Sequence, residues 1–376
     1  MSLIKQIQLT LLIGPTVPIP APRLVMEALQ GVEVTTSAGS RSGFQLVFSL
    51  SNHSPLHTMF LIAANASPFA LRVILIATIN GTPNVLADGV ITRQEIAPAH
   101  GGYATLTITG EDLTTLMDRQ EFNGIPYPAM PAEARVALIC AKYAMYGIIP
   151  LVIPSIFQDI PIPVERIPSH QGTDLAYINK LAADVGYTFY IDPGPLPGMN
   201  TAYWGPEIKI GVPQPALNTD MDAYTNVESL TFNIKHSEKA MPIVFIQNML
   251  TKAPIPIPIP NLNPLQPPLG VAIPIPTRFD LMKDTAKLSP IAAIAKGLAA
   301  AAGTADAVEG SGSLNVMRYG RLLKARQLVG VRGAGMAFDG LYYVKSVTST
   351  LKQGEFNQRF SLSRNALVSI TPVVPA

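Results

Sequence analysis

The 376-residue sequence has few charges: Asp, Glu, Lys and Arg together make up 14% of it, against about 25% in ordinary soluble proteins. A chain with so few charges is expected to bury much of its surface against partners. The formal net charge is only +2, which gives no strong attraction to a polyanion. We therefore expect no specific nucleic-acid partner.

Cysteine and tryptophan each occur once. Cys140 has no partner for an internal disulfide and lies in an apolar helical run, so we interpret it as a buried structural thiol and not a nucleophile. A single cysteine also fits folding in a reducing compartment. With Trp204 alone and 7% aromatic residues, the chain offers few platforms on which sugars could stack, which disfavours a carbohydrate-binding adhesin.

No segment of the sequence predicts a membrane span. The N-terminal apolar run is short and is followed by prolines without a small-residue cleavage site, so no signal peptide is expected. Residues 136–154 are apolar, but Lys142 interrupts them and Gly147 and Pro150 would end any helix early. Residues 253–277 carry no charge but hold nine prolines, which break helices. We expect an extended, polyproline-like strap there.

The most informative pattern lies near the C-terminus. Asp339-Gly340 predicts a tight turn, because both central positions of a type I′ turn need positive φ. A second turn is expected at Gln353-Gly354, after a Tyr-, Val- and Thr-rich run. Beyond it, apolar and polar residues alternate as on the two faces of a strand. The apolar face would hold Phe356, Phe360 and Leu362, and the polar face Asn357, Arg359 and Ser361.

A similar pattern lies earlier, from Asp88 to Leu113, at an offset of 251 to 254 residues. Its paired positions are Asp88-Gly89 with Asp339-Gly340, Gly101 with Gly354, Tyr103 with Phe356, Leu106 with Phe360, Ile108 with Leu362, and Leu113 with Leu367. Any two β-hairpins look alike, so a chance likeness stays open. The similar length and order, with each hairpin closing a separate half of the chain, favour a duplication. We predict two related β-domains in one chain.

Between the β-domains the pattern is that of an α/β insertion. Pro131 suits the first turn of a helix that would run to about Tyr146, with Gly147 as its stop. Thr173 is a candidate N-cap of a second helix, which Gly186 would end. The predicted domains are an N-terminal arm (1–30), a first β-domain (31–118), the insertion (119–226) and a second β-domain (227–370) interrupted by the Pro-rich strap (253–277) and an Ala-rich helix (290–302).

Three segments resemble a known family. Residues 321–367 are similar to the closing hairpin of the late control protein D family, the central hub proteins of contractile phage tails and of related injection systems and type VI spikes. Residues 171–192 resemble the helix-then-strand segment of that family, with an Asp after Gln-Gly-Thr and a helix that ends in Gly-Tyr. Residues 32–50 also resemble the family. The likeness covers most of the chain from Val32 to Leu367, and the strap departs from it.

The resemblance implies a mainly β fold with an α/β insertion, in which two tail-tube-like antiparallel β-barrels are fused in one chain. Three copies would present six similar barrels, so a homotrimeric ring could adapt a sixfold tube to a threefold spike. The implied partners are the chain itself, the inner tube protein hexamer, the trimeric spike protein and other baseplate components. Assembly would take place in the bacterial cytoplasm, as part of a phage tail or injection-system particle.

No catalytic, cofactor-binding or metal site is predicted. The spacing of His53 and His57 would suit a metal site on a helix, but SNHSPLHT favours a loop, and no HExxH is present. Gly333, Gly335 and Gly340 do not make a phosphate loop, and no GxSxG occurs. No two carboxylates stand out as a glycosidase pair. The remaining histidines are His100, His170 and His236.

We therefore predict a non-enzymatic structural hub of a baseplate. The alternative is a cell-wall hydrolase acting at the tail tip, and a third hypothesis is a carbohydrate-binding tail adhesin. Some related spikes carry a lysozyme or toxin fused after the hub. Here the sequence continues for nine residues beyond Leu367, which is too short for such a domain.

Overall fold

The computed structural model describes residues 7–51, 54, 71–98, 103–155, 160–164, 167–234, 240–247, 253–260, 266–283, 285, 290–303 and 306–371. His53, His57, His100, His236 and Gly101 lie outside these residues. The fold is mainly β, as predicted, and the described strands form one 13-stranded sheet and three smaller sheets. The described strands do not close into a barrel within one chain, so barrel closure stays a prediction.

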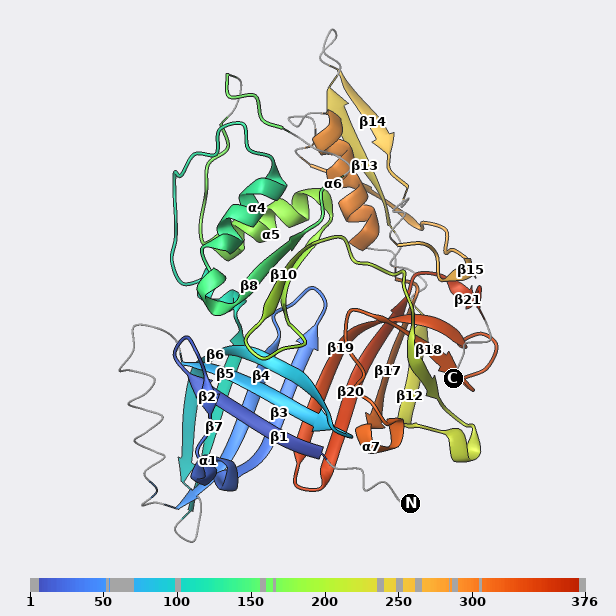
Figure 1. The fold of residues 1–376 in the computed structure, drawn as a ribbon. Coiled ribbons are helices and arrows are strands. Elements are labelled where there is room, and N and C mark those ends of the chain that lie inside the picture. The colour runs from blue at the N-terminus through green and yellow to red at the C-terminus, as the bar shows by residue number, and fades with distance from the viewer. Residues whose placement is uncertain are drawn as a thin grey trace.

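The large sheet forms the lower part of the molecule, and the insertion and a small β/α unit lie above it (Figure 1). Its main path runs β12-β17-β20-β19-β3-β4-β7-β6-β5-β1-β2, and β18 pairs with both β19 and β11. The strands are β1 (Ile7–Gly14), β2 (Ile19–Pro20), β3 (Leu29–Ser37), β4 (Gly43–Ser51), β5 (Arg72–Ile79), β6 (Thr82–Pro98), β7 (Tyr103–Asp112), β11 (Gln214–Asn218), β12 (Val227–Ile234), β17 (Val308–Asn315), β18 (Leu328–Arg332), β19 (Gly340–Lys352) and β20 (Glu355–Arg364).

The two halves of this sheet have the same strand order. In the first half the neighbours are β3-β4-β7-β6-β5, and in the second they are β12-β17-β20-β19-β18. Every neighbouring pair in both series is antiparallel. The strands also follow one another along the chain in the same order in both halves. The topology is therefore that of a duplicated five-stranded unit, and the buried apolar residues of both units form one continuous core.

Irregularities in the strands occur at equivalent places in the two units. β3 has a bulge between Leu29 and Gly31 where it pairs with β4, and β12 has one between Val227 and Ser229 where it pairs with β17. A bulge inserts one extra residue and redirects the strand, so its position is a specific feature of a fold. Because the two bulges lie at equivalent places, Gly31 of β3 corresponds to Ser229 of β12.

A second pair of bulges lies after Ile91 in β6 and after Val344 in β19. The backbone around them is bonded in the same way. Ile91 N–H donates to the carbonyl of Leu71 (3.0 Å), just before β5, and Val344 N–H donates to that of Gln327 (2.9 Å), just before β18. These contacts align β6 with β19 residue by residue.

The structure corrects the predicted alignment of the two hairpins. Gln353-Gly354 forms the two-residue turn expected from sequence, with φ of 78° at Gly354. Asp88-Gly89 is not a turn, because both residues lie inside β6. Asp339-Gly340 is not a two-residue turn either, since residues 333–339 form a longer loop before β19. The bulges also pair Ile108 with Phe360, two residues from the predicted match.

The insertion packs two helices, α4 (Ala132–Ala141) and α5 (Asp174–Val185), on a small sheet of β8 (Ile148–Val152), β10 (Asn200–Gly205) and β9 (Thr188–Pro193). Thr173 caps α5 by accepting a hydrogen bond from Ala176 N–H (3.1 Å), and Gly186 ends it in the left-handed region. Both caps confirm the sequence prediction. The first helix is shorter than expected: it ends at Ala141, and a 3-10 turn (Ala144–Tyr146) follows.

Cys140 and Trp204 both lie in the core of the insertion. Burial and the nearby Asp174 carboxylate raise the pKa of the Cys140 thiol to about 12. A thiol that stays protonated is a poor nucleophile, so the structural interpretation of Cys140 is confirmed. Trp204 is fully buried and offers no stacking surface to a sugar.

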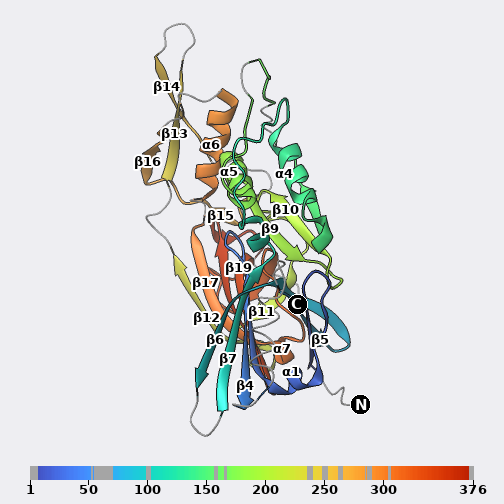
Figure 2. The same cartoon turned by 90° about the vertical axis from the view of Figure 1, so that its left-hand side faces the viewer.

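The strap region contributes to a separate small unit beside α5, in which α6 (Pro290–Gly303) packs on a three-stranded sheet (Figure 2). The strands of this sheet are β13 (Ala240–Gln247), β14 (Pro254–Pro258) and β16 (Arg278–Leu281). A further short pair, β15 (Gly270–Ala272) and β21 (Leu367–Ser369), ties the strap to the end of the chain. Among the described residues no helix is long and apolar enough to cross a membrane.

The described residues of the strap, 253–260 and 266–277, are extended, as predicted, but they do not form an unpaired polyproline segment. β14 pairs with β13 as an edge strand. Ile259 N–H donates to Pro242 O (2.9 Å), so alternate residues direct their N–H groups to β13 and the prolines fall on the outer edge, where no donor is needed. Of the five isoleucines of the strap only Ile259 is buried, whereas Ile255, Ile273 and Ile275 are exposed.

Candidate assembly interface

The two units join through one edge of β19, which pairs with two different strands. Its first residues, Gly340–Tyr343, pair with β18. Its later residues, Ser346–Lys352, pair antiparallel with β3 of the other unit. On the polar face of this joint the hydroxyl oxygens of Thr35 and Thr348 are 3.0 Å apart.

One edge of β6 likewise consists of two parts, but only the first part pairs with a described strand. Thr82–Val90 pairs with β5, and within the described chain no strand pairs with residues 95–98 on that side. β12, the counterpart of β3, pairs with β17 on one edge and with no described strand on the other. The two surfaces that meet in the internal joint therefore occur a second time, at opposite ends of the molecule.

Burial follows this difference closely. Val32 and Val34 of β3 are 2% and 3% exposed, whereas their counterparts in β12, Leu230 and Phe232, are only half-buried. Ser349 of β19 is 5% exposed, and its counterpart Ile96 in β6 is 43% exposed. Apolar side chains thus stay partly or fully exposed in the second copy of the joint, at positions that are buried in the first copy.

The other face of the large sheet is polar and rich in hydroxyls. It carries charges of both signs, and some of them are paired: Arg93 Nη2 lies 3.0 Å from Glu95 and Lys345 Nζ 3.6 Å from Glu309. A face without a dominant charge or an apolar patch offers few groups that could bind another molecule tightly. Its hydroxyl residues are Thr35, Ser49, Thr105, Thr107, Thr109, Ser311, Ser313, Thr348, Thr350 and Ser361.

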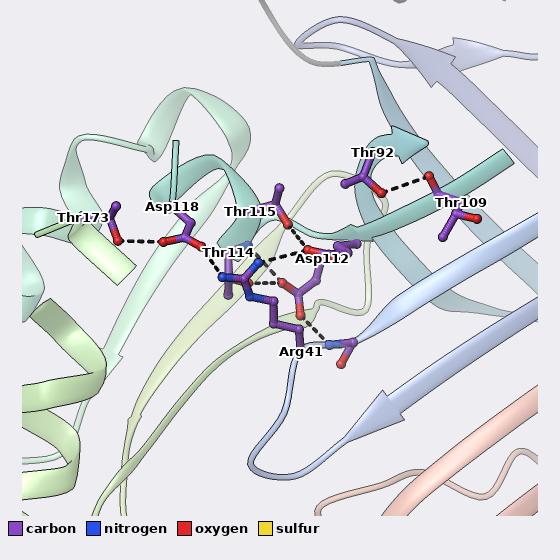
Figure 3. A network of polar contacts seen from close by, with 10 residues as sticks. Arg41, Thr92, Thr109, Asp112, Thr114, Thr115, Asp118 and Thr173 are labelled. Carbon is purple, nitrogen blue, oxygen red and sulfur yellow. Dashed lines mark hydrogen bonds and ion pairs between the residues drawn. The ribbon is translucent and has the colours of Figure 1, made fainter. Parts of the chain in front are cut away.

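A polar network joins the first unit to the insertion (Figure 3). Arg41, in the β3–β4 loop, pairs with Glu111 (3.1 Å) and with Asp118. The hydroxyl of Thr173, the cap of α5, donates to Asp118 Oδ1 (2.7 Å). This hydrogen bond and the Arg41 guanidinium lower the pKa of Asp118 below its ordinary 3.8, while partial burial opposes them.

We expect the stabilising contribution of Asp118 to depend on pH. Since its pKa is lower in the folded chain, the contribution is present above the ordinary value of 3.8 and is lost as the pH falls through the folded-state pKa. Asp118→Asn should therefore be less stable than the wild type at pH 7, with the difference shrinking below about pH 4. Urea unfolding at a series of pH values measures it, and a difference that grew in acid would contradict it.

Asp112, beside this network, behaves in the opposite way. Burial raises the pKa of its carboxyl, and hydrogen bonds from the Thr114 hydroxyl and from the backbone N–H groups of Ser42 and Thr114 partly offset the rise. The carboxylate ties the β3–β4 loop to α3 (Thr114–Met117), because Ser42 N–H donates to Oδ2 (2.8 Å) and Thr114 N–H to Oδ1 (3.0 Å). Its role is to hold that loop.

Arg326 joins both units and the insertion. Its guanidinium pairs with Asp192 in β9, donates to Ser37 O (2.6 Å) in β3 and lies 3.8 Å above the ring of Tyr190. It stands in the left-handed region, with φ of 63°. One side chain, which composition and spacing did not single out, thus contacts three parts of the chain.

The only catalytic-looking cluster that we identify in the described residues surrounds His170. Its ring lies 3.1 Å from the Tyr127 hydroxyl and 3.5 Å from Asp174, which Lys142 also contacts (3.0 Å). Burial lowers the pKa of His170, and its 0% exposure leaves no access for a substrate. The cluster fixes the start of α5. Among the described residues no group of three or more His, Cys, Asp or Glu side chains could hold a metal ion.

No family model and no curated protein matches the sequence. Solved structures do. A tail protein from Neisseria meningitidis MC58 has a TM-score of 0.62 at 12% identity, over 97% of this chain and 98% of its own. The 43 kDa tail protein of prophage MuSo2 from Shewanella oneidensis has a TM-score of 0.58 at 12% identity, over 97% and 99%.

A third similar structure is the E. coli c3393 protein, described as a component of the type VI secretion system with structural similarity to T4 bacteriophage tail proteins gp27 and gp5. Its TM-score is 0.54 at 10% identity, over 92% of this chain and 77% of its own. The fold is therefore that of phage tail and type VI secretion tail proteins. This confirms, for the fold, the resemblance to contractile-tail hub proteins.

Proposed function

We propose that the chain is a structural hub protein of a baseplate, in a phage tail or contractile injection system. Three copies would form a ring that adapts the sixfold inner tube to the threefold spike. The duplicated unit carries this proposal. A chain that holds two copies of one five-stranded unit, in the same strand order and with matching bulges, can offer six similar surfaces from three subunits.

The polar face of the sheet fits the same function. If the eight strands β3, β4, β6, β7, β12, β17, β19 and β20 of each copy line a ring, the hydroxyl-rich face would form the wall of its channel. The core of each subunit lies on the other face. The chain would then act by geometry, without a chemical step.

The proposed partners are further copies of the chain, the hexameric inner tube protein, the trimeric spike protein and other baseplate components. We place assembly in the bacterial cytoplasm. The small charge content of the sequence supports extensive contacts, because ordinary soluble surfaces carry more charge. A protein of this kind should not clear a peptidoglycan suspension, and clearing by the purified chain would favour the hydrolase alternative.

The stoichiometry of the assembled particle tests the proposal. We expect native mass spectrometry of purified baseplates to give three copies of this chain for each spike. Six copies or one copy would contradict the ring. Imaging of the same particles should place the chain between the tube and the spike.

A further inference from the structure

We infer that a second copy of this chain binds at the open part of β6, where Glu95–Ala97 pairs antiparallel with Asn233–Thr231 of β12 in the next subunit. The inference deepens the proposed function, because it names the surface through which the ring would close. The contacts that support it lie within one chain: the joint between β19 and β3 already shows how these two strand types pair.

The register follows from the bulges. Arg93 follows the bulge in β6 as Ser346 follows it in β19, so Glu95 corresponds to Thr348 and Ile96 to Ser349. Gly31 and Ser229 follow the bulges of β3 and β12, so Thr35 corresponds to Asn233 and Val34 to Phe232. The internal joint pairs Thr348 with Thr35 and Ser349 with Val34. The joint between subunits should therefore pair Glu95 with Asn233 and Ile96 with Phe232.

The side chains suit this register on both faces of the sheet. On the polar face, the exposed Asn233 amide can donate to the exposed Glu95 carboxylate, where the internal joint has two hydroxyls in contact. On the core face, Ile96 would meet Phe232, whose ring is held by stacking on Phe338 at a centroid distance of 4.9 Å. Apolar pairs and hydrogen-bonding polar pairs of side chains that face each other across two strands stabilise the strand pairing.

The sequence also sets where the strand pairing ends, and the two surfaces set how the subunits are arranged. Pro98 has no N–H to donate, so the ladder should stop there. The two surfaces differ and lie on different units, so each subunit would use one on either side. A head-to-tail contact of this kind closes into a ring when its rotation permits. A second copy is the favoured occupant because the chain already contains the complementary strand in the complementary register.

Disulfide cross-linking tests the register directly. Side chains that face each other across antiparallel strands have Cβ atoms about 5 Å apart, which a disulfide can span. The double variant Glu95→Cys/Asn233→Cys should give covalent dimers and trimers after mild oxidation, both in the purified chain at high concentration and in assembled particles. Cys140 is buried and should not contribute.

The matched control is Glu95→Cys/Ser229→Cys. Ser229 lies on the same face of β12 but four residues away, roughly 13 Å along the strand, so it should not cross-link with Glu95. Trimers in native mass measurements without a Glu95–Asn233 cross-link would overturn the register and leave the proposed function standing. A particle with one copy or six copies would overturn both. Equal cross-linking of the two double variants would show contact without the inferred register and would also reject it.

Discussion

Asp88→Asn is expected to lower the free energy of unfolding by about 3–5 kcal/mol, the loss typical of breaking one partner from a buried ion pair. Arg72 and Asp88 are 3% and 4% exposed. The guanidinium donates to both carboxylate oxygens, at 2.7 Å each. Asparagine keeps the shape of Asp88 but removes its charge, so the Arg72 cation would stay buried without its counter-ion.

The pair also joins two parts of the chain, which sharpens the expected result. Asn200 of β10 donates to Asp88 Oδ2 (2.8 Å), and Arg72 donates to the Tyr146 carbonyl (2.9 Å) in the insertion. We therefore expect the insertion and the large sheet to lose stability together. Fluorescence of Trp204, buried in β10, reports the insertion, and far-ultraviolet circular dichroism reports the whole chain during urea unfolding.

A control on the same strand separates burial from charge. Glu95 pairs with Arg93 at 3.0 Å, but both side chains are mostly exposed. Exposed ion pairs contribute about 0–1 kcal/mol, so Glu95→Gln should unfold almost as the wild type does. A loss below about 1 kcal/mol in Asp88→Asn would contradict the role that we assign to the buried pair.

The same residues show where sequence reasoning failed. Asp-Gly is a strong local turn signal, yet Asp88 is held inside a strand by Arg72, sixteen residues away. Gly89 serves a different purpose from turning the chain: a Cβ there would lie 2.1 Å from the carbonyl oxygen of Glu111 on β7. Glycine permits the close approach of two strands, and only the tertiary structure can distinguish that from a turn.

The hairpin alignment failed for another reason. A strand repeats every two residues, so sliding one hairpin by two keeps every apolar residue on the core face. The predicted pairing of Ile108 with Leu362 and the observed pairing with Phe360 fit the apolar pattern equally well. The bulges settle the register, and they leave no clear trace in composition or alternation.

Features set by local chemistry were predictable. The turn at Gln353-Gly354, the alternation in β20 and both caps of α5 follow from neighbouring residues. The strap also held a signal that sequence reasoning missed. Proline at every second position, with Ile255 and Ile257 between, matches the period of an edge strand that needs donors on one side only. The open edge of β6 had no such signal, because it exists only where β6 continues past Val90, which lies opposite the first residue of β5.

Ile96→Lys is expected to abolish assembly of the ring while leaving the single chain folded. In one chain Ile96 is 43% exposed, so a lysine there can reach water. In the inferred joint the side chain would lie against Phe232, and the ammonium would be buried without a counter-ion. A cost of about 3 kcal/mol at each joint, in the range for burying an unpaired polar group, weakens that joint roughly 100-fold.

A closed ring repeats the penalty at every joint, so light scattering should find monomers at concentrations where the wild type forms trimers. Leu138→Lys is a suitable control: Leu138 is 50% exposed on α4, away from both open edges, and its variant should assemble normally. The free energy of unfolding of the Ile96→Lys monomer should stay within about 0.5 kcal/mol of the wild type. Intact trimers of this variant would place the contact between subunits elsewhere.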